Sequence, residues 1–74
     1  MNLYRVEFAS NEILSCSLLN DGTTINSAYQ YAHKKGELIY ALIRAEMEKD
    51  ARDIAREIVG ELTGKIIVNT FTTP

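Results

Sequence analysis

The chain has 74 residues, a formal net charge of -2 and an isoelectric point near 5.2. Its one cysteine, Cys16, and one histidine, His33, exclude an intramolecular disulfide and a closed zinc site with about four Cys and His ligands. The acidic balance disfavours nucleic-acid binding, and the longest apolar run, residues 38–43, is too short to cross a bilayer, which takes about 20 residues.

The length allows one domain, residues 1–74, near the lower size limit at which a single hydrophobic core supports a fold. Small domains are commonly reinforced by disulfides, by a structural metal or by oligomerisation. Because the cysteine and histidine counts exclude the first two, self-association is the reinforcement that we expect.

The N-terminal residues predict a protein that is not exported. Arg5 and Glu7 interrupt the apolar residues of positions 1–8, unlike the basic head and continuous apolar run of a signal peptide. A single free thiol is typical of the reducing cytoplasm. We therefore expect a cytoplasmic location and no association with a membrane.

Two β-strands are predicted in the first 20 residues. Apolar side chains recur at every second position over residues 2–9 and again over residues 12–19, which is the period of a strand with one buried face. Ser10 and Asn11 between them are turn formers, so the two strands should make a hairpin. The cluster Asn20-Asp21-Gly22 then ends the second strand.

The segment 25–35 fits two different structures. Helical spacing of its apolar residues, a candidate N-cap at Thr24 and the C-terminal signal Lys34-Lys35-Gly36 favour a helix over 25–35. In the alternative, Tyr29, Tyr31 and His33 form one face of a strand, and Lys34-Lys35-Gly36 becomes a hairpin turn within residues 27–45. We prefer the helix.

The second half of the chain predicts a strand, a helix and a strand. Residues 38–44 are apolar at nearly every position, which is typical of a central strand covered on both faces. A helix is predicted over 47–62, ending near Gly64, because apolar residues there form one helical stripe: Ala51, Ile54, Ala55, Ile58, Val59 and Leu62. Residues 65–72 are rich in Ile, Val, Thr and Phe and predict a last strand.

These elements together predict a two-layer α+β or α/β sandwich. The sheet should be mixed, with about four strands, and both helices should cover one face in the order ββαβαβ. If residues 27–45 form a hairpin instead, the order becomes ββββαβ.

No residue pattern identifies a catalytic, cofactor-binding or metal-binding site. Cys16 lies at an alternating apolar position, where a small buried side chain is expected. His33 is the one imidazole that could act as its base, but nothing in the spacing brings the two together. The polar segment 20–24 is typical of a turn followed by a helix cap. We therefore expect neither enzymatic activity nor a cofactor.

The predicted sheet would have one face that the chain itself leaves uncovered. If both helices lie on the same face, alternation places Leu38, Tyr40 and Leu42 on one side of the central strand and Ile39, Ala41 and Ile43 on the other, and one of these rows stays bare. Helices on opposite faces would cover both rows and remove the need for a dimer. Burial of such a row, at about 25 cal/mol per Å², matters to a marginally stable fold. We therefore predict a homodimer through the open face or an edge of the sheet. Its candidate interface residues are Tyr4, Leu38, Tyr40 and Leu42.

Three classes of function fit this sequence. The preferred class is a small non-catalytic interaction or regulatory protein with a protein-binding surface, for which an origin in a phage or mobile element would suit the size and the lack of motifs. The second class is a small enzyme or ligand-binding protein with a site between subunits that includes Cys16 or His33. The third, disfavoured by net charge, is a nucleic-acid-associated module using the basic residues Arg5, Lys34, Lys35, Arg44 and Lys65.

Overall fold

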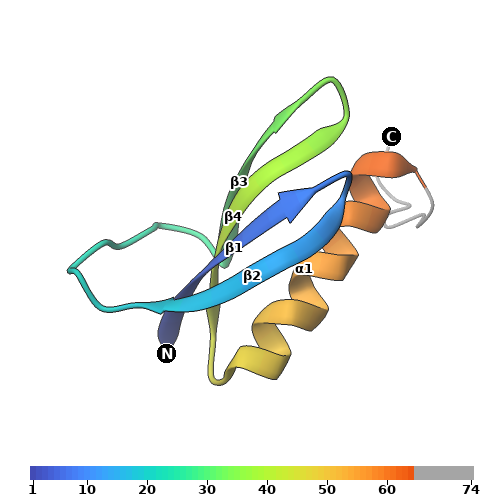
Figure 1. Cartoon of the computed structure of the whole chain (residues 1–74). Coiled ribbons are helices and arrows are strands. Elements are labelled where there is room, and N and C mark those ends of the chain that lie inside the picture. The colour runs from blue at the N-terminus through green and yellow to red at the C-terminus, as the bar shows by residue number, and fades with distance from the viewer. Residues whose placement is uncertain (65–74) are drawn as a thin grey trace, which may run out of the picture.

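The computed structural model describes residues 1–64, in which one helix packs on one face of a four-stranded antiparallel sheet (Figure 1). The elements are, in chain order, β1 Asn2–Ala9, β2 Glu12–Leu19, β3 Tyr29–Lys34, β4 Glu37–Ala45 and α1 Glu48–Thr63. The strand order across the sheet is β2-β1-β4-β3. The strands β1 and β4 are therefore central, and β2 and β3 are the two edges.

Both hairpins turn on two residues with positive φ. Ser10 and Asn11, with φ of 53° and 61°, join β1 to β2, and Lys35 and Gly36, with φ of 55° and 81°, join β3 to β4. Two successive residues in the left-handed region form the turn whose twist matches that of the flanking strands. The predicted hairpin of residues 2–19 is confirmed.

The helix predicted over 25–35 is wrong. Tyr29–Lys34 is the strand β3, which pairs with β4 in antiparallel orientation. The alternative hairpin is thus the one that forms, because pairing with β4 outweighs a short helical pattern made of Tyr and Ala. Thr24, the candidate N-cap, lies in the loop 20–28, where the Asp21 carboxylate accepts a 3.0 Å hydrogen bond from the Thr23 N–H.

Two further features of the preferred fold are also wrong. Across residues 1–64 the sheet is antiparallel rather than mixed, and it carries one helix instead of two. Both differences follow because residues 29–45 form a second hairpin. Two β-hairpins placed side by side need no parallel crossover and no helix to make one. The strand predicted over 65–72 lies outside the described residues.

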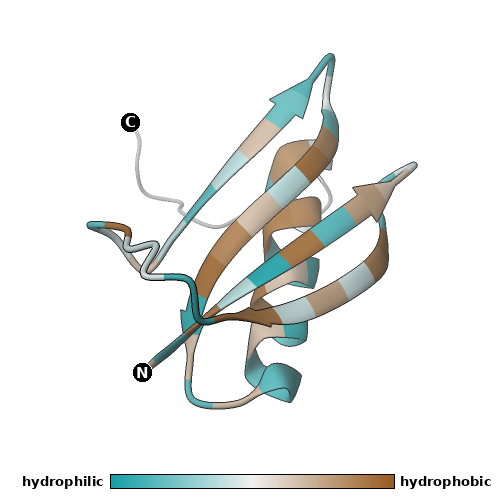
Figure 2. Cartoon of the chain, turned by 60° about the vertical axis from the view of Figure 1, so that its left-hand side comes forward, coloured by the Kyte–Doolittle hydropathy of each residue, from teal (hydrophilic) through white to brown (hydrophobic). Residues whose placement is uncertain are grey.

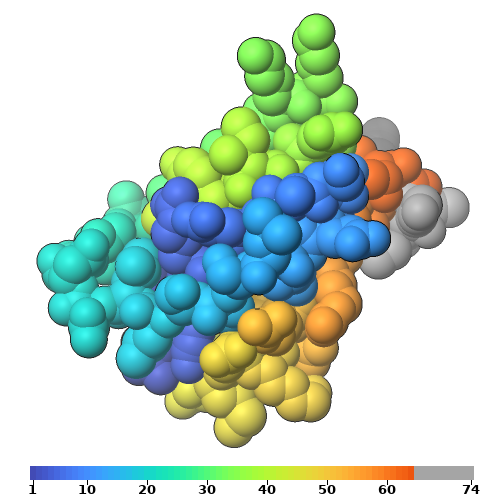
Figure 3. Space-filling view, in the orientation of Figure 1, coloured from blue at the N-terminus to red at the C-terminus, as the bar shows by residue number. Residues whose placement is uncertain are grey.

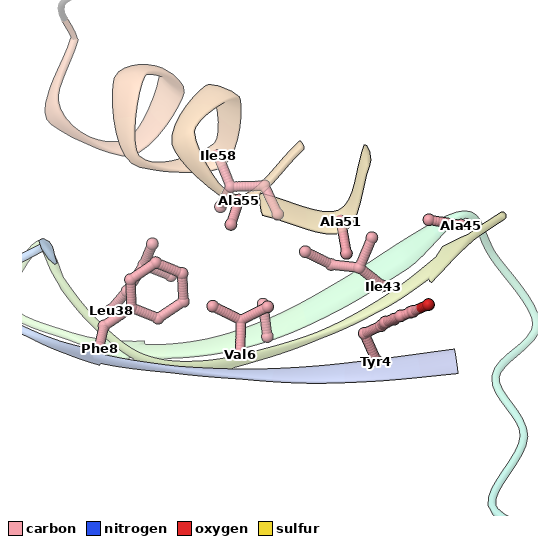
Figure 4. Close-up of a cluster of buried hydrophobic side chains, with 10 residues drawn as sticks. Tyr4, Val6, Phe8, Leu38, Ile43, Ala45, Ala51, Ala55 and Ile58 are labelled. Atoms are coloured by element: carbon pink, nitrogen blue, oxygen red, sulfur yellow. The ribbon is translucent and has the colours of Figure 1, made fainter. Parts of the chain in front are cut away.

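The predicted helix over 47–62 is confirmed, with bounds of Glu48–Thr63. Its buried face includes Ala51, Ala55 and Ile58 and packs on β4, β2 and β1 (Figures 1 and 4). The helix ends at Gly64, whose φ of 78° permits its N–H to donate to the Glu61 carbonyl at 3.2 Å.

The core fills the space between α1 and the two central strands (Figure 4). Val6 of β1, Ile43 of β4 and Ile58 of α1 are its largest fully buried side chains. Small alanines at positions 41, 51 and 55 let the helix approach the sheet closely. The whole cluster consists of Tyr4, Val6, Phe8, Leu38, Ala41, Ile43, Ala45, Ala51, Ala55 and Ile58.

A β-bulge in β4 changes which residues face the helix. Ala32 pairs with Tyr40 and His33 pairs with Leu38, so Ile39 is an extra residue in β4. Leu38 consequently joins the core, while Tyr40 stays on the open face of the sheet. Simple alternation, which places these two residues on one side, fails here because of the bulge.

The side chain of Asn11 connects the turns of the two hairpins. Its Oδ1 accepts a hydrogen bond from the Leu38 N–H at 2.8 Å, and its Nδ2 donates to the Gly36 carbonyl at 3.2 Å. Asn11 thereby satisfies two backbone groups at the end of the sheet where both hairpins turn.

We expect Asn11→Gly to lower the free energy of unfolding by about 1–3 kcal/mol. Glycine keeps the positive φ and loses both side-chain hydrogen bonds, so the loss reports on those bonds. Asn11→Asp, which keeps the acceptor for Leu38, should lose less. Urea unfolding followed by circular dichroism measures both, and an Asn11→Gly midpoint equal to that of the natural chain would contradict this role.

The N-terminus of α1 has no side-chain cap. Met47 has the extended backbone of an N-cap residue, with φ -148° and ψ 164°, but its side chain accepts no hydrogen bond. Met47→Ser should therefore stabilise the chain by about 0.5–2 kcal/mol. Met47→Ala is the control, because it removes the methionine without providing a cap. Thermal melting should rank Ser above Ala, and equal midpoints would contradict the prediction.

Candidate functional site

The four candidate interface residues lie on two different faces of the sheet. Tyr4 and Leu38 are buried beneath α1, whereas Tyr40 and Leu42 belong to the open face. Three of the four are buried within the chain, and Tyr40 is half-buried. The structure therefore does not bring them together into one surface, and an interface made of them stays a prediction.

The open face is largely closed by its own side chains. The Arg5 guanidinium lies 4.2 Å from the centre of the Tyr40 ring, and Arg5 Nε is 3.0 Å from the Glu7 carboxylate. Leu3 and Leu42, the aliphatic residues of this face on the central strands, are each only 9% exposed. The expected bare apolar row is absent from this face over residues 1–64.

Exposed large apolar side chains occur on both edge strands, and also at the bulge residue Ile39 of β4 and at Met1 and Met47 outside the sheet. On β2, the side chains of Leu14 and Leu18 are 67% and 53% exposed. Figure 3 shows β2 on the surface, beside the first turns of α1. No charged residue occurs from Ile13 to Leu19, so this edge lacks the lysines with which proteins commonly protect free strands. Figure 2 shows the alternation of polar and apolar residues along the strands.

The opposite edge, β3, has a different chemistry. Tyr29, Tyr31 and His33 form a row of rings, with centroids 6.3 Å apart for the tyrosines and 5.8 Å apart for Tyr31 and His33. Burial raises the pKa of Tyr29, and the carboxylate of Glu61 raises it further. Lys34 ends this strand, so the β3 edge is aromatic and cationic where β2 is aliphatic and uncharged.

Cys16 and His33 do not meet within one chain. They lie on β2 and β3, the two edges, which are separated by three strand spacings of about 4.8 Å, or about 14 Å in all. Burial raises the pKa of the Cys16 thiol, as does the Glu48 carboxylate, against the opposing charge of Arg52. This environment disfavours the thiolate that a nucleophile needs.

A depression of about 320 Å³ lies between the β1–β2 turn and α1. Two of its lining residues, Arg52 and Arg56, already form ion pairs with Glu48 at 2.8 Å and Asp53 at 3.3 Å. Because both arginines already pair with carboxylates of the same chain, they give the depression little net charge with which to bind a ligand.

Residues 1–64 contain neither a candidate metal site nor a membrane-spanning helix. This part of the chain contains no cluster of three His, Cys, Asp or Glu side chains placed to hold a metal ion. Its helix is too short and too polar to cross a membrane.

We expect Cys16 to react slowly with thiol reagents in the folded chain. The raised pKa leaves less thiolate at neutral pH, so the pH profile of the reaction rate with a disulfide reagent should have a higher midpoint than in the urea-unfolded chain. Because the unfolded chain ionises first, stability should fall as pH rises through the ordinary thiol pKa. A folded midpoint at or below the unfolded one would contradict this.

Comparison of the chain with protein-family models, with curated proteins and with solved structures found no match.

Proposed function

We propose that this protein is a small, non-catalytic interaction protein that works as a homodimer and presents a β-sheet surface to protein partners. The observation that supports the proposal is the pair of outer strands, β2 and β3, in the sheet of residues 1–64, where large apolar side chains are exposed. Leu14 and Leu18 lie on β2, and Tyr31 lies on β3.

A free edge strand offers its unpaired N–H and C=O groups to another strand. β2 is eight residues long, and its one irregularity is the extra residue Leu14 opposite β1. Such a strand both exposes apolar area and provides main-chain hydrogen bonds, which are the two requirements for binding by strand addition.

The chemistry of the polar residues supports a binding role rather than catalysis. Cys16 and His33 are on opposite edges, and the exposed charges of α1 form ion pairs along the helix, such as Lys49 with Asp53 at 2.9 Å. The free thiol of Cys16 also suits a reducing compartment, and we propose the cytoplasm as the location.

Light scattering of the full chain tests the proposal. We expect the measured mass to rise as the concentration increases from micromolar to millimolar, toward twice the 8.3 kDa mass of one chain. Asn26→Lys in the loop 20–28, away from both edges, is the control and should leave the mass unchanged. A chain that stays monomeric throughout this range would contradict the proposed homodimer.

A further inference from the structure

We propose that two copies of the chain pair along β2 in antiparallel orientation, with the two-fold axis at Cys16, so that their four-stranded sheets become one continuous sheet. This inference rests on the proposed function and names its first partner, a second copy of the same chain. It goes beyond that function by fixing the edge, the orientation and the register.

The sequence of β2 is self-complementary about Cys16. Read outward from this residue in either direction, it gives a serine, a leucine and then a second large aliphatic residue. Antiparallel pairing centred on Cys16 therefore places residues of the same kind opposite each other, and no charge faces a like charge between Ile13 and Leu19. The opposed pairs are Ser15 with Ser17 and Leu14 with Leu18 of the second copy. The matched stretch ends there, because the extra residue Leu14 turns Ile13 to the helix side of the sheet.

The pairing would cover the two exposed large apolar side chains of this strand. Leu14 and Leu18 retain 67% and 53% of their exposure in the single chain. In the proposed register each leucine meets its counterpart across the interface, and such aliphatic cross-strand pairs stabilise sheets. The same contact would also satisfy the outward N–H and C=O groups of β2.

The adjoining helix lies on the same side of the sheet as Cys16. Cys16 pairs with Val6 and so lies on the side of the sheet that α1 covers, where Glu48 and Arg52 act on its thiol. Antiparallel pairing of two identical edges puts both helices on the same side of the joint sheet.

The other edge fits a second copy less well. β3 ends at Lys34 and is followed by Lys35, and lysines on an edge oppose pairing with another strand. A substitution on β3 therefore serves as the control for one on β2.

The native cysteine provides the first test. Residues directly opposite at the axis of an antiparallel pair have Cα atoms about 4.5–5.5 Å apart, which is within the span of a disulfide. Because the Cys16 thiol reacts slowly, the full chain is oxidised with diamide for hours at mildly alkaline pH; this should give a covalent dimer on a non-reducing gel, and Cys16→Ser should abolish it.

Cysteine substitutions at Ser15 and Ser17 test the register without using the partly buried thiol of Cys16. In the Cys16→Ser background, Ser15→Cys and Ser17→Cys should cross-link to each other when mixed, because the register puts them opposite. Each alone should cross-link far less, since its own copies lie diagonally across the axis. Equal cross-linking of each variant with itself would overturn the register.

A charge on the exposed part of β2 gives an independent readout. Leu18→Lys should weaken the dimer by about tenfold or more, because it places a charge in an aliphatic pair twice per dimer. Tyr31→Lys on β3 should leave the dimer intact. Circular dichroism checks that both variants remain folded.

These outcomes separate the inference from the proposed function. A dimer that forms normally in Leu18→Lys, weakens in Tyr31→Lys and gives no Cys16 cross-link would overturn β2 pairing while keeping the homodimer. A natural chain that is monomeric at millimolar concentration would overturn both.

Discussion

The packing of α1 against the central strands holds this fold together. The chain has one cysteine, so the core has no disulfide within the chain to support it, and the interlocking of Val6, Ile43 and Ile58 is its main source of stability. Alanines on the facing side of the helix bring it close to the sheet. All the buried apolar residues of the sheet lie on β1 and β4, so apolar burial is greatest at the centre of the sheet and least at its outer strands.

One irregularity in β4 changes which apolar side chains stay exposed. The bulge at Ile39 moves Leu38 under the helix, which leaves the open face with Tyr40 beneath the Arg5 guanidinium and Leu42 nearly buried. The remaining exposed large apolar side chains are scattered over β2, β3, the bulge residue Ile39 and the two methionines. This distribution favours recognition through main-chain pairing over recognition through a flat hydrophobic face.

Much of the fold could be predicted from the sequence, because the strands over 2–9 and 12–19 and the helix over 47–62 have clear and different periods. The segment 25–35 could not, since Tyr and Ala suit both periods and only pairing with β4 selects the strand. The bulge at Ile39 has no sequence signature, so the assignment of Leu38 to a face failed. The symmetry of β2 is visible in its residues, but its position at an edge depends on the strand order.

Asn11 has a consequence for the way in which the chain reaches this structure. The hairpins of residues 2–19 and 29–45 can each form from local contacts, within microseconds, whereas their union through β1 and β4 joins distant segments. The bonds from Asn11 to Gly36 and Leu38 exist only after that union. They belong to the late, non-local stage of folding, in which the two halves of the sheet become one cooperative unit.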